Sequence, residues 1–332
     1  WMPARMLRAL ALLIAVAHSS AFGIVSPSIP RTWQASPTAC QKMLSISRTS
    51  AKRGHQLCMG SPVAPASAQG TSPAPLAEED GQRSCRVYNT PGLVDYPSAL
   101  QFQKDLQRER IDHKVAHKGK PPFSLPDALV LVEHPEVYTL GSSSEASHIL
   151  FPLDQSQVAE VGGSISVEEE GEDGARFQVH RVQRGGKVTY HCPGQLVGYP
   201  IVDLARHQQD IDWYLRSIEN VLISVLDSYG VKAGTIDGLT GVWVDGKKIA
   251  AVGVGASRWV TLHGWALNID NDMQGFKRIV PCGIADRPVC CLKDFLCDDC
   301  PPVSEVREKV TEAFMAAFDL DAVRMPSPLS SK

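Results

Sequence analysis

The sequence predicts an α+β fold in which mixed β-sheets are flanked by helices. Two segments, 211–229 and 306–318, have apolar residues at helical spacing, and several short apolar segments between residues 129 and 267 have the length and alternation of strands. Helices and strands are mixed along the chain, with hairpin signals among them. One domain of roughly 240 residues fits this pattern better than two smaller domains.

The first elements follow from local composition. Residues 129–132 form an apolar run bounded by prolines, so we expect a buried strand there, and 187–191 and 197–202 also read as strands. The helix predicted over 211–229 is followed by Gly230, a natural stop.

The later elements include a hairpin and a final helix. Asp245–Gly246 is a strong turn signal, and it predicts a hairpin between strands at 242–244 and 249–254. Residues 259–267 continue the strand-rich region. The helix over 306–318 follows two prolines, with Ser304 as its expected cap.

Charge is distributed unevenly along the 332 residues. The net charge of −3 gives no reason to expect nucleic acid as a partner. Residues 1–77 contain seven Lys and Arg but no Asp or Glu, whereas the remainder has 26 Lys and Arg against 36 Asp and Glu, a net charge of −10. We therefore expect a leader at 1–77, a folded domain at 78–325 and a disordered tail at 326–332. The acidic stretch 168–173 is expected to be a solvated loop, with a partner-docking patch as the alternative.

The leader has two parts. Arg5 and Arg8 precede the apolar run 9–17, which has the length of a signal-peptide core and is too short to span a bilayer. Residues 23–75 are rich in Ser, Ala, Pro and basic residues, as transit peptides are. Such two-part leaders are typical of proteins sent to plastids of secondary origin, so we expect a plastid. A mitochondrial presequence and a disordered leader without an address are the alternatives.

Four segments are suited to a binding site. Residues 184–195 begin with an arginine and paired glycines that let a backbone approach a ligand closely. Small residues in 248–253 and 263–268 leave space against a sheet, and Cys282 lies on a turn between proline and glycine. Taken singly, each segment also has a structural explanation: a surface hairpin, a solvated lysine, a buried strand histidine and an ordinary cysteine.

Together with residues 132–141, these segments resemble the octanoyltransferase family, also called lipoyl(octanoyl) transferase or lipoate–protein ligase B. The resemblance extends from about Tyr88 to the C-terminal helix. It implies the biotin/lipoate protein ligase fold, with an acyl chain in a tunnel between sheets. It also implies that Cys282 carries the acyl group and that Lys248, not Lys247, is its partner. The implied acyl pocket consists of Arg184, Gly185, Gly186, Lys187, Val188, Thr189, Tyr190, His191, Ala251, Val252, Gly253, Gly264, Trp265 and Ala266.

The implied reaction moves octanoyl from acyl carrier protein to a lysine of a lipoyl-accepting protein. The donor thioester on the phosphopantetheine arm exchanges with a thiol at nearly equal free energy, so no nucleotide and no bound cofactor are expected. A cysteine suits this step because its free pKa of ~8.5 leaves some thiolate at neutral pH. Lys248 can stabilise that thiolate as an ammonium or accept a proton as a neutral amine, and both remain open. His191 is a candidate for orienting the acyl carbonyl or relaying a proton.

The expected acceptors are lipoyl domains of 2-oxoacid dehydrogenase E2 subunits and the glycine-cleavage H protein. A basic patch for the acidic carrier is expected at Lys118, Lys120 or 277–278. The resemblance suggests a monomer, and nothing indicates a membrane partner. Three other functions are alternatives: an amidotransferase between lipoyl-accepting proteins, an ATP-dependent ligase of the same fold and a non-catalytic carrier-binding module. The ligase needs no cysteine nucleophile, whereas the amidotransferase uses one.

The remaining cysteines raise two questions. The family usually has glycine where this chain has Cys192, and we expect a tolerated substitution, with acyl interception or oxidation as alternatives. Cys297 and Cys300, near Cys290 and Cys291, are expected to be surface thiols. A zinc site and a redox pair are the alternatives, although four well-spaced ligands are not evident, so no metal is expected.

Overall fold

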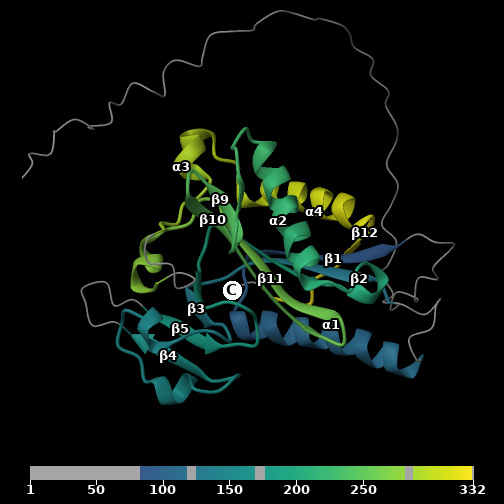
Figure 1. Cartoon of the computed structure of the whole chain (residues 1–332), viewed down its shortest axis with the longest axis horizontal. Helices are drawn as coiled ribbons and strands as arrows, with labels where there is room; N and C mark the ends of the chain where they lie inside the picture. The colour runs from purple at the N-terminus through teal and green to yellow at the C-terminus, as the bar shows by residue number, and fades with distance from the viewer. Residues whose placement is uncertain (1–82, 118–124, 169–175, 281–286, 331–332) are drawn as a thin grey trace, which may run out of the picture. The chain divides into compact units, whose positions relative to one another are not determined.

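The computed structural model describes residues 83–117, 125–168, 176–280 and 287–330 (Figure 1). Within these residues the strands form two sheets. The eight-stranded sheet has the order β12 (Asp321–Met325), β1 (Ser84–Leu93), β2 (Asp127–Glu133), β7 (Gln195–Ile201), β11 (Val260–Asn268), β10 (Lys247–Ser257), β9 (Leu239–Val244) and β8 (Gly234–Ile236). The four-stranded sheet has the order β4 (Ser164–Glu168), β5 (Arg176–Arg181), β3 (Val137–Leu140) and β6 (Val188–His191).

Both sheets are mixed. In the large sheet β12, β1 and β2 are parallel, and the pairs from β2 through β7, β11, β10 and β9 to β8 are antiparallel. In the small sheet β3 is parallel to β5 and antiparallel to β6. The expected α+β fold with mixed sheets and flanking helices is therefore confirmed.

Helices cover both faces of the large sheet. α1 (Tyr96–Ala116) packs on one face, and α2 (Ile211–Asp227) and α4 (Val303–Phe318) pack on the other (Figure 1). Strand β2 is buried on both sides: Leu129 faces the core under α2 and α4, and Val130 faces the core under α1. A strand covered on both faces reads as a continuous apolar run, and this is why the sequence predicts it well.

The hairpin and the first helix stop are confirmed. Asp245 and Gly246 have φ values of 49° and 76°, the left-handed pair that a two-residue hairpin turn requires. α2 ends at Asp227, and Gly230 follows with a φ of 77°. The amide of Val231 then donates to the Leu226 carbonyl at 3.1 Å, which satisfies a carbonyl at the helix end.

The cap expected at Ser304 is wrong. α4 begins at Val303, its cap residue is Pro302, and no side chain there accepts a capping hydrogen bond. Pro302 has the extended conformation that precedes a helix, so the chain enters α4 without Ser304, which lies inside the first turn.

Smaller elements complete the fold. They are the 3₁₀ turns η1 (Ala146–His148), η2 (Gln155–Val158), η3 (Leu204–Arg206), η4 (Gln274–Arg278) and η6 (Cys297–Asp299), and the short helix α3 (Lys293–Leu296). Beyond β12, the Ser327 and Thr90 hydroxyls are 2.5 Å apart, and Leu329 packs against the core under α1. In the described part of the chain, no helix has the length and apolarity needed to cross a membrane. The boundaries of the leader, domain and tail stay predictions.

Candidate functional site

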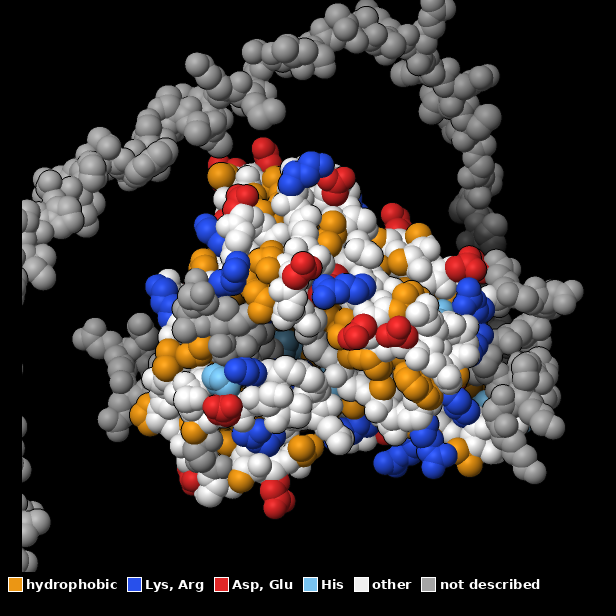
Figure 2. All heavy atoms as spheres, in the orientation of Figure 1, with side chains coloured by type: hydrophobic (Ala, Val, Ile, Leu, Met, Phe, Trp, Pro, Cys, Tyr) orange, Lys and Arg blue, Asp and Glu red, His pale blue; other side chains and the backbone are white. Residues whose placement is uncertain are grey.

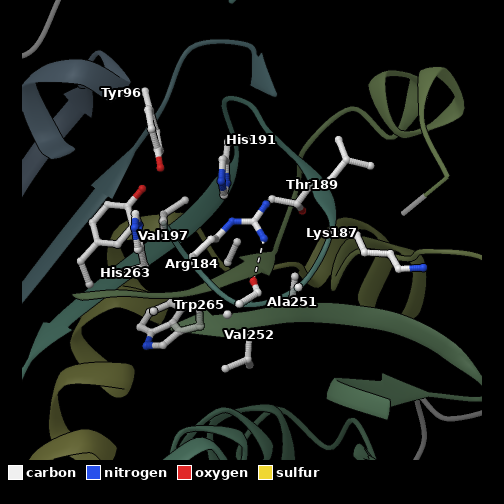
Figure 3. A pocket seen from close by; sticks show the side chains of 17 residues that line it. Tyr96, Arg184, Lys187, Thr189, His191, Val197, Ala251, Val252, His263 and Trp265 are labelled. Atoms are coloured by element: carbon white, nitrogen blue, oxygen red, sulfur yellow. Dashed lines mark hydrogen bonds between the residues drawn. The ribbon is translucent and has the colours of Figure 1, made fainter. Parts of the chain in front are cut away.

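A pocket of about 490 Å³, part of it open to solvent, lies between the two sheets (Figure 3). The small sheet contributes β6 and the loop before it, the large sheet contributes β7, β10 and β11, and α1 contributes its first residue. The lining residues are Tyr96, Arg184, Gly185, Gly186, Lys187, Val188, Thr189, His191, Val197, Tyr199, Ala251, Val252, Gly253, His263, Gly264, Trp265 and Ala266.

The structure brings the predicted pocket residues together, with one exception. Tyr190 does not line the pocket, because neighbouring side chains on β6 point to opposite faces. Its ring packs instead against Tyr138 and Phe276, at 4.8 and 5.3 Å between centroids, in the core of the small sheet.

Some lining residues were not predicted from the sequence. Tyr199 and Val197 alternate along β7 on the pocket side, a signal that could have been used once β7 was assigned. Tyr96 begins α1, a helix that was not expected. His263 was considered but read as a core histidine. His263 is buried, at 2 % exposed, and it also lines the pocket.

Close backbone contacts explain the glycines of the pocket wall. The Gly185 amide donates to the Val254 carbonyl at 2.9 Å, so the loop before β6 lies directly on β10. A Cβ on Gly253 would be 2.9 Å from the Gly185 carbonyl oxygen. A Cβ on Gly264 would be 2.2 Å from the Gly198 carbonyl oxygen. Gly264 therefore lets β7 pair closely with β11, and it also leaves space in the pocket.

Arg184 fixes that loop to the small sheet. Its Nη2 donates to the carbonyl oxygen and the hydroxyl of Thr139, at 2.7 and 2.9 Å, and its Nη1 donates to the Gly185 carbonyl at 3.0 Å. In Figure 3 the guanidinium lies between His191 and Ala251. Arg184 therefore anchors to the small sheet the loop whose Gly185 amide is bonded to β10.

Buried histidines at the pocket are held neutral. Burial lowers the pKa of His191 to about 3, and the neighbouring His134 contributes to the shift. His191 Nδ1 is 2.8 Å from Gln195 Oε1. Because Gln195 directs its amide nitrogen at Asn268 Oδ1, its oxygen faces His191, so Nδ1 carries the proton. Nε2 is then an acceptor and cannot donate to an acyl carbonyl, and the low pKa also disfavours a proton relay through His191.

His263 is held in an uncommon backbone conformation. Its φ is 64°, and its amide donates to Gln103 Oε1 of α1 at 3.1 Å. Burial lowers the pKa of His263 to about 3, with Arg184 adding to the effect. Left-handed φ values in non-glycine residues cost of order 1 kcal/mol and concentrate at functional sites.

A second pocket of about 270 Å³ adjoins the first and contains Lys248. The two pockets share Thr189, Ala251 and Ala266, and the second is also lined by Gln195, Asn268, Phe276 and Val289. Lys248 is buried, whereas the neighbouring Lys247 is exposed. Lys248 Nζ donates to the Thr240 carbonyl at 3.0 Å and lies 4.7 Å from the centre of the Trp243 ring.

A β-bulge turns Lys248 toward the pocket. Lys248 pairs with Trp243 of β9, but Ala250 pairs with Val242, so Ile249 is an extra residue on β10. Regular alternation would place residues 248 and 251 on opposite faces of the sheet. The bulge reverses that alternation, so Lys248 and Ala251 line the same pocket.

Cys282 lies outside the described residues, but its flanking segments are described. The Val280 amide donates to the His148 carbonyl at 2.9 Å. On the other side, the Pro288 carbonyl accepts from the Lys248 amide at 2.9 Å, and the Cys290 amide donates to the Lys248 carbonyl at 3.0 Å. The chain that follows residue 286 is thus paired directly with Lys248.

Comparison with known proteins identifies the family. Residues 95–315 match the lipoyl protein ligase A/B catalytic domain. The chain belongs to this family. The expected biotin/lipoate protein ligase fold is thereby confirmed.

Curated relatives narrow the assignment. The chain is 45% identical over 244 residues to an octanoyltransferase of Nostoc sp., covering 73% of this chain and 96% of that protein. It is 46% identical to an octanoyltransferase of Gloeobacter violaceus, covering 69% and 88%. It is also similar, at 16% identity and a TM-score of 0.49, to the bi-partite lipoate protein ligase of Thermoplasma acidophilum, covering 74% and 87%. The first two relatives place the chain among the octanoyltransferases, which are acyltransferases.

Within this octanoyltransferase fold, Cys192 lines neither of the two described pockets. It is 2 % exposed and belongs to the core of the small sheet. Burial raises its pKa to about 12, so its thiol stays protonated at neutral pH. A buried, protonated thiol is a poor nucleophile, which argues against acyl interception.

The C-terminal cysteines differ in exposure. Cys290 and Cys291 are buried, Cys300 is half-buried and Cys297 is exposed. The expectation of surface thiols therefore holds for Cys297 and, in part, for Cys300. Cys290 and Cys291 are buried thiols. Among the residues that the structure describes, no group of three or more His, Cys, Asp or Glu side chains is arranged to hold a metal ion.

Proposed function

We propose that this enzyme transfers an octanoyl group from the phosphopantetheine thioester of acyl carrier protein to a lysine of lipoyl-accepting proteins, through a thioester on Cys282. The acceptors are proposed to be lipoyl domains of E2 subunits and the glycine-cleavage H protein. Thioester exchange needs no nucleotide, so the proposed reaction uses no bound cofactor.

The observation that carries this proposal is the continuity of the two pockets along β11. Asn268 lines the Lys248 pocket, Ala266 lies at the junction, and Gly264 lines the larger pocket. From residue 268 to residue 264 a strand advances about 13 Å. An extended eight-carbon chain is about 10 Å long, given carbon–carbon bonds of about 1.5 Å. An octanoyl chain with its carboxyl carbon near Lys248 therefore fits along the strand.

The wall of this groove suits an alkyl chain. Ala251 and Ala266 face each other on paired strands at the junction, and Gly253 and Gly264 do so farther along. Their small side chains leave the space that the acyl chain occupies, and the loop at Gly185 covers it from the small sheet. The neutral histidines add no charge to this wall.

The chemistry proposed for Cys282 depends on Lys248. The cysteine thiolate attacks the thioester carbonyl, the pantetheine thiolate leaves, and an acyl–enzyme thioester remains. The acceptor amine then attacks this thioester, loses a proton, and releases Cys282 as a thiolate. Lys248 stabilises the thiolate as an ammonium or accepts the proton as an amine. Pairing of Lys248 with Pro288 and Cys290, shortly after Cys282 in the chain, supports this assignment.

The region around the Lys248 pocket suits an acidic carrier protein. Lys277 and Arg278 lie on η4 with Phe276, which lines that pocket. Figure 2 shows basic side chains on both sides of a hollow in which histidine side chains are visible. Lys118 and Lys120 lie outside the described residues. We propose that the carrier docks beside η4.

The test is intact-mass spectrometry after incubation with octanoyl-carrier protein in the absence of ATP, followed by peptide mapping. We expect one octanoyl group on Cys282, no adduct in Cys282→Ala, and transfer of the group to an added lipoyl domain. The Cys297→Ala variant, which changes an exposed thiol, is the matched control and should be acylated normally.

Other outcomes would favour other reactions. Acylation that requires ATP would indicate a ligase of the same fold. Acylation of Cys282 by an octanoylated lipoyl-accepting protein, but not by octanoyl-carrier protein, would indicate an amidotransferase.

A further inference from the structure

One peptide group connects Lys248 with a buried carboxylate on the opposite side of the sheet. The carbonyl oxygen of Thr240 accepts a hydrogen bond from Lys248 Nζ at 3.0 Å. The amide of Gly241, which belongs to the same peptide group, donates to Glu219 Oε1 of α2 at 2.6 Å. The ammonium, the peptide and the carboxylate therefore lie in one hydrogen-bonded row.

Burial of the Glu219 carboxylate costs free energy, because the charge is removed from water. It is 0 % exposed, on the face of α2 that packs against the large sheet. Its second oxygen accepts from Arg216 Nη1 at 2.5 Å, and the Arg216 side chain is 49 % exposed. A buried carboxylate is costly unless its oxygens are hydrogen-bonded, and both oxygens of Glu219 have partners.

Gly241 makes the row possible. Its φ is +123°, a conformation that L side chains rarely adopt. A Cβ there would be 2.7 Å from the Ala250 carbonyl oxygen and 3.2 Å from Lys248 Cε. Any larger residue would displace either β10 or the stem of Lys248. The peptide thus presents its carbonyl to Lys248 and its amide to Glu219 only because residue 241 is glycine.

The hydrogen bond between Gly241 and Glu219 also affects the hydrogen bond that Lys248 makes with the same peptide group. A carboxylate that accepts from a peptide N–H polarises that peptide, so its carbonyl becomes a stronger acceptor. The ammonium form of Lys248 gains most from a stronger acceptor. The carboxylate therefore strengthens the hydrogen bond that orients Lys248 Nζ.

We propose that Glu219 is a positioning residue for octanoyl transfer, acting on Lys248 through the Thr240–Gly241 peptide. This inference rests on the proposed function, in which Lys248 assists the cysteine. Glu219 touches neither the acyl chain nor the carrier: it is absent from the lining of both described pockets and lies on α2, across the sheet from α1 and the small sheet. Its contribution should appear in the chemical step and not in donor binding.

The experiment compares Glu219→Gln with Glu219→Ala in steady-state octanoyl transfer. The glutamine keeps an oxygen acceptor for Gly241 but removes the charge. We expect kcat of Glu219→Gln to fall about tenfold, with KM for octanoyl-carrier protein unchanged within about twofold, and a larger loss in Glu219→Ala. A role limited to holding β9 in place would be restored by glutamine, so wild-type kcat in Glu219→Gln would overturn the proposal.

A matched control lies on the same helix. The Asp210 carboxylate caps α2 by accepting from the Trp213 amide at 3.0 Å and is not among the contacts of the row. Asp210→Ala should lower the melting temperature of the protein as removal of a helix cap does, yet leave kcat unchanged below the unfolding range. If kcat also falls tenfold in Asp210→Ala, the loss seen in the Glu219 variants is explained by a less stable α2. That outcome would overturn the proposal.

A second measurement does not need activity. The denaturation midpoints of wild type, Glu219→Gln, Lys248→Met and the double variant form a cycle. We expect a smaller shift from Glu219→Gln when Lys248 is absent, and additive shifts would contradict the connection. If the wild type transfers no octanoyl group, the proposed function fails, whereas this cycle still decides whether Glu219 and Lys248 are coupled.

Discussion

The histidines around the pocket act as neutral groups because the fold excludes water from them. His134 is 0 % exposed, with Nδ1 2.6 Å from the Val94 carbonyl oxygen and Nε2 2.8 Å from the Tyr199 hydroxyl. Its ring lies 5.7 Å from that of His191, between centroids. Burial lowers the pKa of His134 to about 4 from its ordinary value of 6.5. Protonation of any member of this group would place an unpaired charge beside the acyl pocket.

This burial predicts how stability depends on pH. Below pH 6.5 the unfolded chain binds a proton at His134, whereas the folded protein does so only near pH 4, so acid favours unfolding between these values. His134→Gln removes this proton. We expect the free energy of unfolding of the variant to fall less steeply with decreasing pH than that of the wild type, by up to about 1.4 kcal/mol per pH unit. Urea denaturation at several pH values from 7.5 to 5 measures the difference.

The opposite outcome is clear. If the unfolding free energy of His134→Gln follows the wild-type pH dependence, His134 is protonated in the folded protein at these pH values and the neutral cluster is wrong.

At the level of elements, the sequence predicts the strands and helices whose inward positions are mostly apolar. β2, α2 and α4 are of this kind, although Glu219 of α2 and Arg307 of α4 are buried as well, and they were expected at nearly the observed positions. α1 was not expected, because two of its inward positions, Gln103 and Arg110, are polar. Arg110 is buried by donating to the Leu106 carbonyl at 2.8 Å, and Gln103 accepts from the His263 amide. Such partners are known only once the chain has folded.

The bulge in β10 shows a second limit of sequence patterns. The Asp245–Gly246 turn predicts the hairpin, but nothing in the local composition indicates that Ile249 is an extra residue. Without the bulge, Lys248 and Ala251 would face opposite sides, and no single pocket could contain both. The resemblance to the family named both residues, and only the structure explains how one strand presents them to the same pocket.

The groove formed by β10 and β11 predicts how acyl chain length is selected. Ala251 lies at the junction of the pockets, about two strand residues, or ~7 Å, from the end at Lys248. Ala251→Leu fills the junction, so an octanoyl chain no longer passes, whereas a butanoyl chain still fits. We expect the ratio of kcat/KM for butanoyl to that for octanoyl donors to rise at least about tenfold, the equivalent of about 1.4 kcal/mol.

The matched control is Ala256→Leu, which makes the same change at an exposed position of the same strand. Its chain-length preference should equal that of the wild type. An Ala251→Leu enzyme that still prefers octanoyl would show that the acyl chain does not follow β11.

For the whole molecule, the described structure accounts for the part of the chain that matches the family. The match covers residues 95–315, and the described strands extend it to Ser84 and Met325. Residues 1–77 lie outside the described part, and their composition and the apolar run 9–17 are the basis for their expected role. A leader needs charge and apolar patterning but no packed core, so its role is read from composition and not from packing.

We propose that residues 1–77 direct the enzyme into a plastid and are not needed for catalysis. A chain that begins at Glu78 should therefore match the full-length protein in melting temperature and in octanoyl transfer. The 1–77 segment fused to a fluorescent protein should enter the plastid of a cell whose plastid is of secondary origin. A fusion with Arg5 and Arg8 left in place but residues 9–17 replaced by serine and glycine should fail to enter, because the apolar core is needed for the first targeting step. Fluorescence in mitochondria, unaffected by loss of the apolar core, would instead assign the segment as a mitochondrial presequence.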